Sequence, residues 1–240
     1  MKRFLPYLST LFIAALFIQW DSSAIKSVPI HKFGFEADSG FILKPQAEQL
    51  LKKIHLDTLD VSYIYSKDTD TIGKYYKTAG GNFYACIEVP YHAAHKIAEV
   101  SVDGKIIRSE DFYSGSSFCC WNNSYDGFQK HGKYFTIKSC STGSAYCSGE
   151  LDVFEKLTKR TDSSILESEW VGFTGDKYSY DLSSKMQIRN DTIFMKYTIE
   201  KGVLKKKWKV KKTKTFDVFY TLKNSKWIAS DTTKLIDYRY

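Results

Sequence analysis

Residues 192–200 read TIFMKYTIE, and this stretch decides the fold class. Its apolar residues at alternate positions are Ile193, Met195, Tyr197 and Ile199. The other face would carry the polar residues Thr192, Lys196, Thr198 and Glu200. Successive side chains of a β-strand point to opposite faces of a sheet. The pattern therefore predicts a strand with one buried and one solvent-exposed face.

The surrounding sequence repeats this pattern. The next alternating apolar set is Phe216, Val218, Tyr220 and Leu222. Asn190-Asp191 precedes the first strand, and Asn224-Ser225 leads into the segment 226–229. Asn and Asp are typical of tight turns because they tolerate positive φ angles. Residues 169–240 are therefore predicted to form an antiparallel β-meander.

Two further hairpins are predicted upstream. The first joins 98–102 to 105–108 through Asp103-Gly104, a dipeptide typical of a two-residue type I′ turn. The second joins 134–140 to 146–154 through a turn around Thr142-Gly143. The segment 109–132 between the hairpins, rich in Ser, Gly and Asn, is predicted to be a loop.

One helix is expected near residues 45–54, with Pro45 in its first turn and Lys52 and Lys53 in its last. The predicted fold is therefore mainly β, with antiparallel sheets arranged as a meander and hairpins, sandwich-like or barrel-like. The polar segment 155–168 is a candidate boundary between a β-rich region at 25–154 and the meander at 169–240. The alternative is one continuous domain.

The N-terminus is predicted to be a signal peptide spanning residues 1–24. Lys2 and Arg3 precede an apolar core at 11–18, and Ser22-Ser23-Ala24 provides the small residues of a cleavage site. The core is short for a membrane span, which needs about 20 apolar residues, although an uncleaved anchor is the alternative. No later segment is apolar enough to span a membrane. The protein is therefore expected to be exported, periplasmic or secreted.

The five cysteines suggest disulfides, because an exported chain meets an oxidising compartment. A turn at 142–145 would place Cys140 opposite Cys147, close enough for a bond. Either Cys119 or Cys120 is a candidate partner for Cys86. The alternative is a set of reduced, buried thiols.

His92 and His95 are weak candidates for a metal site. Their i, i+3 spacing would let both side chains reach one ion from a helical turn, with a cysteine completing the site. A polar loop after Pro90 is the simpler interpretation, and no bound cofactor is predicted.

A run of lysines surrounds Trp208 and Val210. In a strand, Trp208 and Val210 would share one face, and Lys207, Lys209 and Lys211 would form a ladder on the other. Such lysines either prevent edge-to-edge association of sheets or bind an anionic partner. The partner could be an anionic polymer, the envelope surface or an acidic protein, and no nucleic acid is expected.

No catalytic motif is evident in the sequence, so an enzyme is not the leading hypothesis. The leading hypothesis is an exported β-rich protein that binds a ligand or a surface. One alternative is an envelope immunity or inhibitor protein that antagonises a toxin or lytic enzyme. Another is an envelope hydrolase whose active site forms only in the folded chain.

Overall fold

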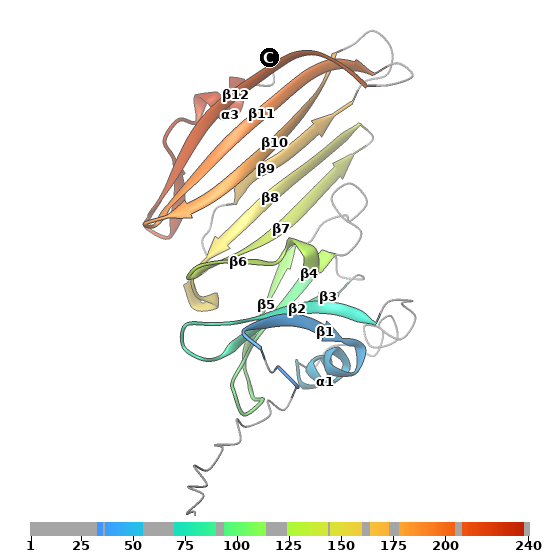
Figure 1. Cartoon of the computed structure of the whole chain (residues 1–240), viewed down its shortest axis with the longest axis vertical. Helices are drawn as coiled ribbons and strands as arrows, with labels where there is room; N and C mark the ends of the chain where they lie inside the picture. Colours follow the sequence, from blue (N-terminus) through green and yellow to red (C-terminus); the bar gives the residue numbers. More distant parts are fainter. Residues whose placement is uncertain are drawn as a thin grey trace, which may run out of the picture.

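The structure is a computed structural model of the whole chain, and it describes residues 33–35, 37–54, 70–89, 94–113, 124–143, 145–159, 164–172, 178–204 and 208–237. The described chain is mostly β, as predicted, and forms two antiparallel sheets. In Figure 1 the two sheets follow one another along the longest axis of the molecule. No helix in the described part is long and apolar enough to cross a membrane.

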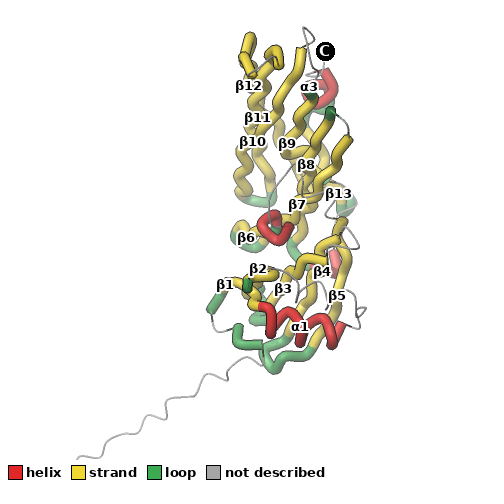
Figure 2. Tube along the Cα trace, turned by 90° about the vertical axis from the view of Figure 1, so that its right-hand side faces the viewer, coloured by secondary structure: helices red, strands yellow, loops and turns green. Residues whose placement is uncertain are grey.

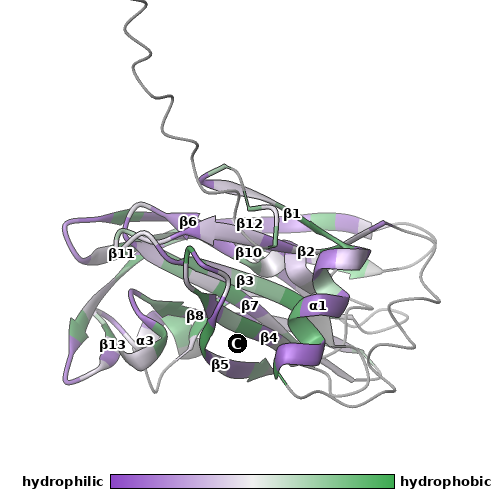
Figure 3. Ribbon diagram, turned by 90° about the horizontal axis from the view of Figure 1, so that it is seen from below, coloured by the Kyte–Doolittle hydropathy of each residue, from purple (hydrophilic) through white to green (hydrophobic). Residues whose placement is uncertain are grey.

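The smaller sheet has five strands in sequence order: β1 (Ser39–Leu43), β2 (Thr71–Lys77), β3 (Phe83–Val89), β4 (Ala94–Val100) and β5 (Ile106–Tyr113). The predicted helix is confirmed as α1 (Lys44–Ile54), which packs Ala47, Leu50 and Leu51 against one face of this sheet. Figure 2 shows α1 lying across the sheet, and in Figure 3 its ribbon alternates between hydrophilic and hydrophobic segments. An amphipathic helix of this length gains its stability mainly from such packing.

The larger sheet has eight strands, again in sequence order: β6 (Gln129–His131), β7 (Tyr134–Gly143), β8 (Tyr146–Phe154), β9 (Ile165–Val171), β10 (Tyr178–Arg189), β11 (Thr192–Leu204), β12 (Trp208–Lys223) and β13 (Lys226–Ala229). The predicted meander is therefore present, and it begins earlier than expected. The short helices are η3 (Ser124–Gly127), η4 (Leu157–Lys159) and α3 (Thr233–Asp237). The predicted loop at 109–132 instead contains the end of β5, η3 and β6.

Residues 155–164 connect two neighbouring strands of the larger sheet, β8 and β9, and residues 165–168 already belong to β9. The change from one sheet to the other lies between Tyr113 and Gln129. The division between the sheets therefore differs from the one that the polar composition of 155–168 suggested.

Local sequence explains the tight turns. Both residues of Asn190-Asp191 and of Asn224-Ser225 have positive φ, between 46° and 61°, as a type I′ turn requires. The turn at Asp103-Gly104 is of another type, because Gly104 has a positive φ of 76° and Asp103 does not have a positive φ. The Ser101 N–H donates to the Lys105 carbonyl, so this hairpin has a longer loop than the predicted type I′ turn.

The larger sheet curls so that strands far apart in its order meet across one hydrophobic core. Trp227 of β13 donates a hydrogen bond from Nε1 to the Val153 carbonyl of β8, at 3.0 Å. Its ring also packs edge-on against Tyr134 of β7, with the ring centroids 5.8 Å apart. The Tyr197 hydroxyl on β11 donates to the Leu166 carbonyl on β9. These contacts stabilise the curl, although the sheet is not a closed barrel in the described chain.

Aromatic side chains join the two sheets. Phe135 of β7 lies 4.8 Å from the ring of Tyr84 on β3, and Phe154 of β8 lies 5.3 Å from that of Phe112 on β5. All four residues are buried. The smaller sheet thus packs α1 on one face and the β7–β8 end of the larger sheet on the other.

Candidate functional site

Positive charge is concentrated in the last quarter of the chain. Residues 178–240 contain 15 lysines and arginines and 6 aspartates and glutamates, a formal charge of +9. The rest of the chain has 20 basic and 21 acidic residues, a formal charge of −1. The excess charge therefore belongs to the region of β10–β13, and this region is the candidate for contact with an anionic partner.

Four exposed lysines of β12 form what we call the basic edge: Lys209, Lys211, Lys212 and Lys214. Within the described residues, none of these lysines forms an ion pair. Their charges repel one another and are balanced by solvent ions, which an anionic partner can displace.

The arrangement differs from the predicted ladder. Of its three lysines, Lys207 lies outside the described residues, while Lys209 and Lys211 are exposed on β12. On β11, Gly202 pairs with Val210 and Lys201 pairs with Lys212, which leaves Lys211 in a bulge. A bulge interrupts the alternation of a strand, so the regular ladder does not continue to Lys211. Trp208 begins the strand and is half-buried over Gly202.

β12 is also an open edge of the larger sheet over most of its length. β13 pairs with β12 only at residues 220–223, and Ser230 extends this contact to Phe219. Residues 208–218 therefore pair with β11 on one side and with no other strand in the described chain. The basic edge lies along this open segment.

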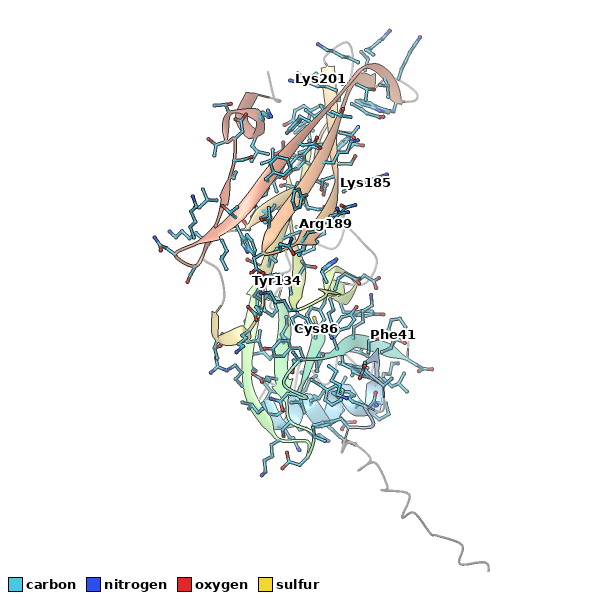
Figure 4. The ribbon with its side chains drawn as sticks, turned by 60° about the vertical axis from the view of Figure 1, so that its left-hand side comes forward. Phe41, Cys86, Tyr134, Lys185, Arg189 and Lys201 are labelled. Atoms are coloured by element: carbon cyan, nitrogen blue, oxygen red, sulfur yellow. The ribbon has the colours of Figure 1, made fainter. Side chains whose placement is uncertain are left out.

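The outer face of β10–β12 carries a groove of about 520 Å³, and none of the four lysines of the basic edge lines it. Phe194 and Phe219 pack edge to face there, with ring centroids 5.1 Å apart, although they are 36% and 43% exposed. Lys185 and Lys196 face each other across β10 and β11 and line the same groove. Figure 4 shows Lys185 projecting away from the sheet. Exposed aromatic rings flanked by amino groups suit contact with an anionic ligand that also has apolar surface.

A second cavity, of about 280 Å³, lies where the two sheets meet. Tyr84 lines it, and the Leu157 N–H donates to the Tyr84 hydroxyl at 3.3 Å. Burial raises the pKa of Tyr84, so its phenol stays neutral at physiological pH. The charged residues of the lining are Glu99, Glu155, Lys133 and Lys156. The charges of these two acidic and two basic groups cancel, so the cavity favours neither anionic nor cationic ligands.

A third cavity, of about 190 Å³, brings a histidine and a hydroxyl together. His131 Nε2 lies 3.2 Å from Thr136 Oγ1, and burial lowers the pKa of His131. Thr136 is 2% exposed, however, and a nucleophile must reach its substrate as well as its base. Ser184 Oγ is buried there without a hydrogen-bond partner in the described chain, so a water molecule or a polar ligand would satisfy it. The pair does not form an accessible catalytic site.

The predicted bond between Cys140 and Cys147 is wrong. β7 continues to Gly143, which pairs with Tyr146, so the turn is two residues shorter than expected. Cys140 therefore faces Gly149, and Cys147 faces Thr142 and carries a free thiol. Cys140 is disulfide-bonded, to a residue other than Cys147. Cys119 and Cys120 lie outside the described residues.

Thiol labelling of unreduced protein from its own compartment checks this assignment. Cys147 is half-exposed, so it should react with iodoacetamide without prior reduction, whereas Cys140 should react only after reduction. Peptide mapping by mass spectrometry gives the readout. Recovery of a peptide that links Cys140 to Cys147 would show that the register of β7 and β8 is different.

The helical turn expected at His95 is not present. His95 belongs to strand β4, where it pairs with Glu88 and Phe112, and His92 lies outside the described residues. The described part of the chain also contains no group of three or more His, Cys, Asp or Glu side chains placed to bind a metal ion.

The sequence therefore identified the lysines of β12 and missed the groove on the outer face of β10–β12. Phe194 was the available signal, because it stands at a position of its strand that otherwise holds polar residues. No family model matches the chain, and the comparisons with curated proteins and with solved structures also found no match.

Proposed function

We propose that the chain is an exported binding protein without catalytic activity, and that it holds an anionic partner on the basic edge. The observation that carries the proposal is the segregation of charge: β12 presents four exposed lysines without ion pairs among the described residues. Export rests on the signal-like residues 1–24, which the structure does not describe.

The geometry of β12 favours binding over simple protection of an edge. Proteins protect a sheet edge by shortening or covering its strand, or by placing lysines or a β-bulge on it. β12 has 16 residues, of which 208–218 pair on one side alone within the described chain. The groove with Phe194 and Phe219 offers a separate contact area on the outer face of the same sheet, where Lys185 and Lys196 supply positive charge. An inhibitor or immunity protein that binds an acidic target would use the same surface, whereas no described residue favours the hydrolase hypothesis.

The proposal predicts that the full chain binds dextran sulfate, a soluble anionic polymer, and that binding weakens with salt. In the edge triple variant, Lys209, Lys211 and Lys214 are replaced by glutamine. Each lysine near an anionic surface contributes about 1 kcal/mol, so the variant should bind about a hundredfold more weakly. Titration calorimetry at 0.05 M and 0.15 M NaCl measures both effects, because ions screen exposed charges.

A control triple variant separates the position of the charges from their number. Lys52→Gln, Lys77→Gln and Lys105→Gln change the net charge equally, on α1, β2 and the β4–β5 turn. This variant should keep wild-type affinity to within a few-fold. If the edge triple variant binds dextran sulfate like the wild type and only self-associates more, the lysines protect the edge and the proposal is wrong.

A further inference from the structure

The backbone of β12 offers a second kind of recognition besides charge. Ser230 N–H donates to the Phe219 carbonyl at 2.7 Å, and the Phe219 N–H donates to Ser230 Oγ at 3.1 Å. The peptide groups of Phe219 therefore point away from β11. In an antiparallel strand every second residue points its N–H and C=O to the same side. The backbone N–H and C=O groups of Thr213, Thr215 and Asp217 therefore point toward the open side of β12. This regular stretch ends at the bulge at Lys211.

This open side is long enough for another strand. Residues 208–218 extend over roughly 36 Å at about 3.3 Å per residue, which exceeds the length of a mean strand of 5–6 residues. No described residue forms a backbone hydrogen bond to this side of the segment. An extended polypeptide could add to the sheet here, as peptides do at other exposed sheet edges.

The side chains on this edge determine which charge an added strand should carry. The segment 208–218 holds the four lysines of the basic edge and one acidic residue, Asp217. A second copy of β12 would bring four more lysines to the same edge, and the repulsion between these like charges disfavours that pairing. An acidic strand would place carboxylates against the same lysines. The charge of the edge thus favours an acidic strand over a second copy of β12.

We propose that β12 binds an extended, acidic polypeptide segment as an added antiparallel or parallel strand, with residues 213–217 supplying the backbone hydrogen bonds. This inference rests on the proposed function, since it names the partner of the same basic edge. An acidic polysaccharide or a phosphate-bearing surface would use the lysines alone, because it has no peptide groups to pair with the strand.

The test compares two probes on the full chain at one salt concentration. One probe is a synthetic peptide of twelve residues that alternates Glu and Thr, and the other is dextran sulfate. Thr215→Pro removes the outward N–H at an edge position, where proline is tolerated. Thr215→Val keeps that N–H and serves as the control. Thr215→Pro should bind the peptide about tenfold more weakly, since it loses a ladder hydrogen bond and its geometry, and should bind dextran sulfate like the wild type.

Hydrogen exchange of the wild-type protein gives an independent readout if the proline variant is destabilised. The peptide should slow exchange of the amides of Thr213, Thr215 and Asp217, and dextran sulfate should leave them unchanged. Peptide binding without this protection, or equal peptide affinity for Thr215→Pro and Thr215→Val, would overturn the inference while leaving lysine-dependent binding of dextran sulfate intact. If the wild type binds neither the peptide nor dextran sulfate, the proposed function itself is contradicted.

Discussion

Replacing Trp227 by alanine is expected to lower the free energy of unfolding by about 3–5 kcal/mol, the usual range for deleting a large buried aromatic side chain. Trp227 is 4% exposed, and it connects the last strand of the larger sheet to β7 and β8 through Tyr134 and the Val153 carbonyl. Its loss leaves a cavity and removes a buried hydrogen bond to the Val153 carbonyl. Urea denaturation followed by circular dichroism measures the change.

Trp170→Ala is the matched control, because the same atoms are removed from a ring that is 36% exposed. Its cost should be about 1 kcal/mol or less. Trp227→Phe should fall between the two, since it keeps apolar volume and loses the hydrogen bond to Val153. If Trp227→Ala costs no more than Trp170→Ala, the curl of the larger sheet is not stabilised by this contact.

Phe135→Ala should cost a similar 3–5 kcal/mol for a different reason. Phe135 is 2% exposed, and its ring packs against Tyr84 of the smaller sheet at 4.8 Å and against Phe154 at 5.9 Å. Because this residue lies in the core shared by both sheets, its loss should destabilise them together. Urea denaturation followed in parallel by tryptophan fluorescence and circular dichroism measures the change.

The described tryptophans all belong to the larger sheet, whereas circular dichroism reports on both sheets. Coincident transitions at a lower urea midpoint are expected for the variant. Phe41→Ala is the control, because Phe41 of β1 is 57% exposed and should cost less than about 1 kcal/mol. A Phe135→Ala variant as stable as this control would show that the two sheets do not share a core at Phe135.

The sequence could predict the strands and turns that depend on local chemistry. The alternation in 192–200 and the positive φ angles at Asn190-Asp191 and Asn224-Ser225 arise within a few residues, and the structure confirms them. The helix at Lys44–Ile54 is predictable for the same reason, from Pro45 and its apolar face.

Features that depend on distant contacts could not be predicted. The turn between β7 and β8 is two residues shorter than expected, which shifts the pairing of the two strands. Cys140 therefore lies opposite Gly149 instead of Cys147. The sequence likewise cannot show that β13 covers only one end of β12, because the length of both strands and their pairing decide it. The lysines were therefore predictable, whereas their position on an open edge was not.

The relative affinity of the two triple variants for dextran sulfate tests the central claim most directly. Both variants lose three positive charges, and they differ in whether those charges come from β12 or from the region of the smaller sheet. If the basic edge binds the anionic partner, the edge triple variant should bind about a hundredfold more weakly than the control triple variant at 0.05 M NaCl. Equal dissociation constants for the two variants would contradict the account, because binding would then follow net charge alone.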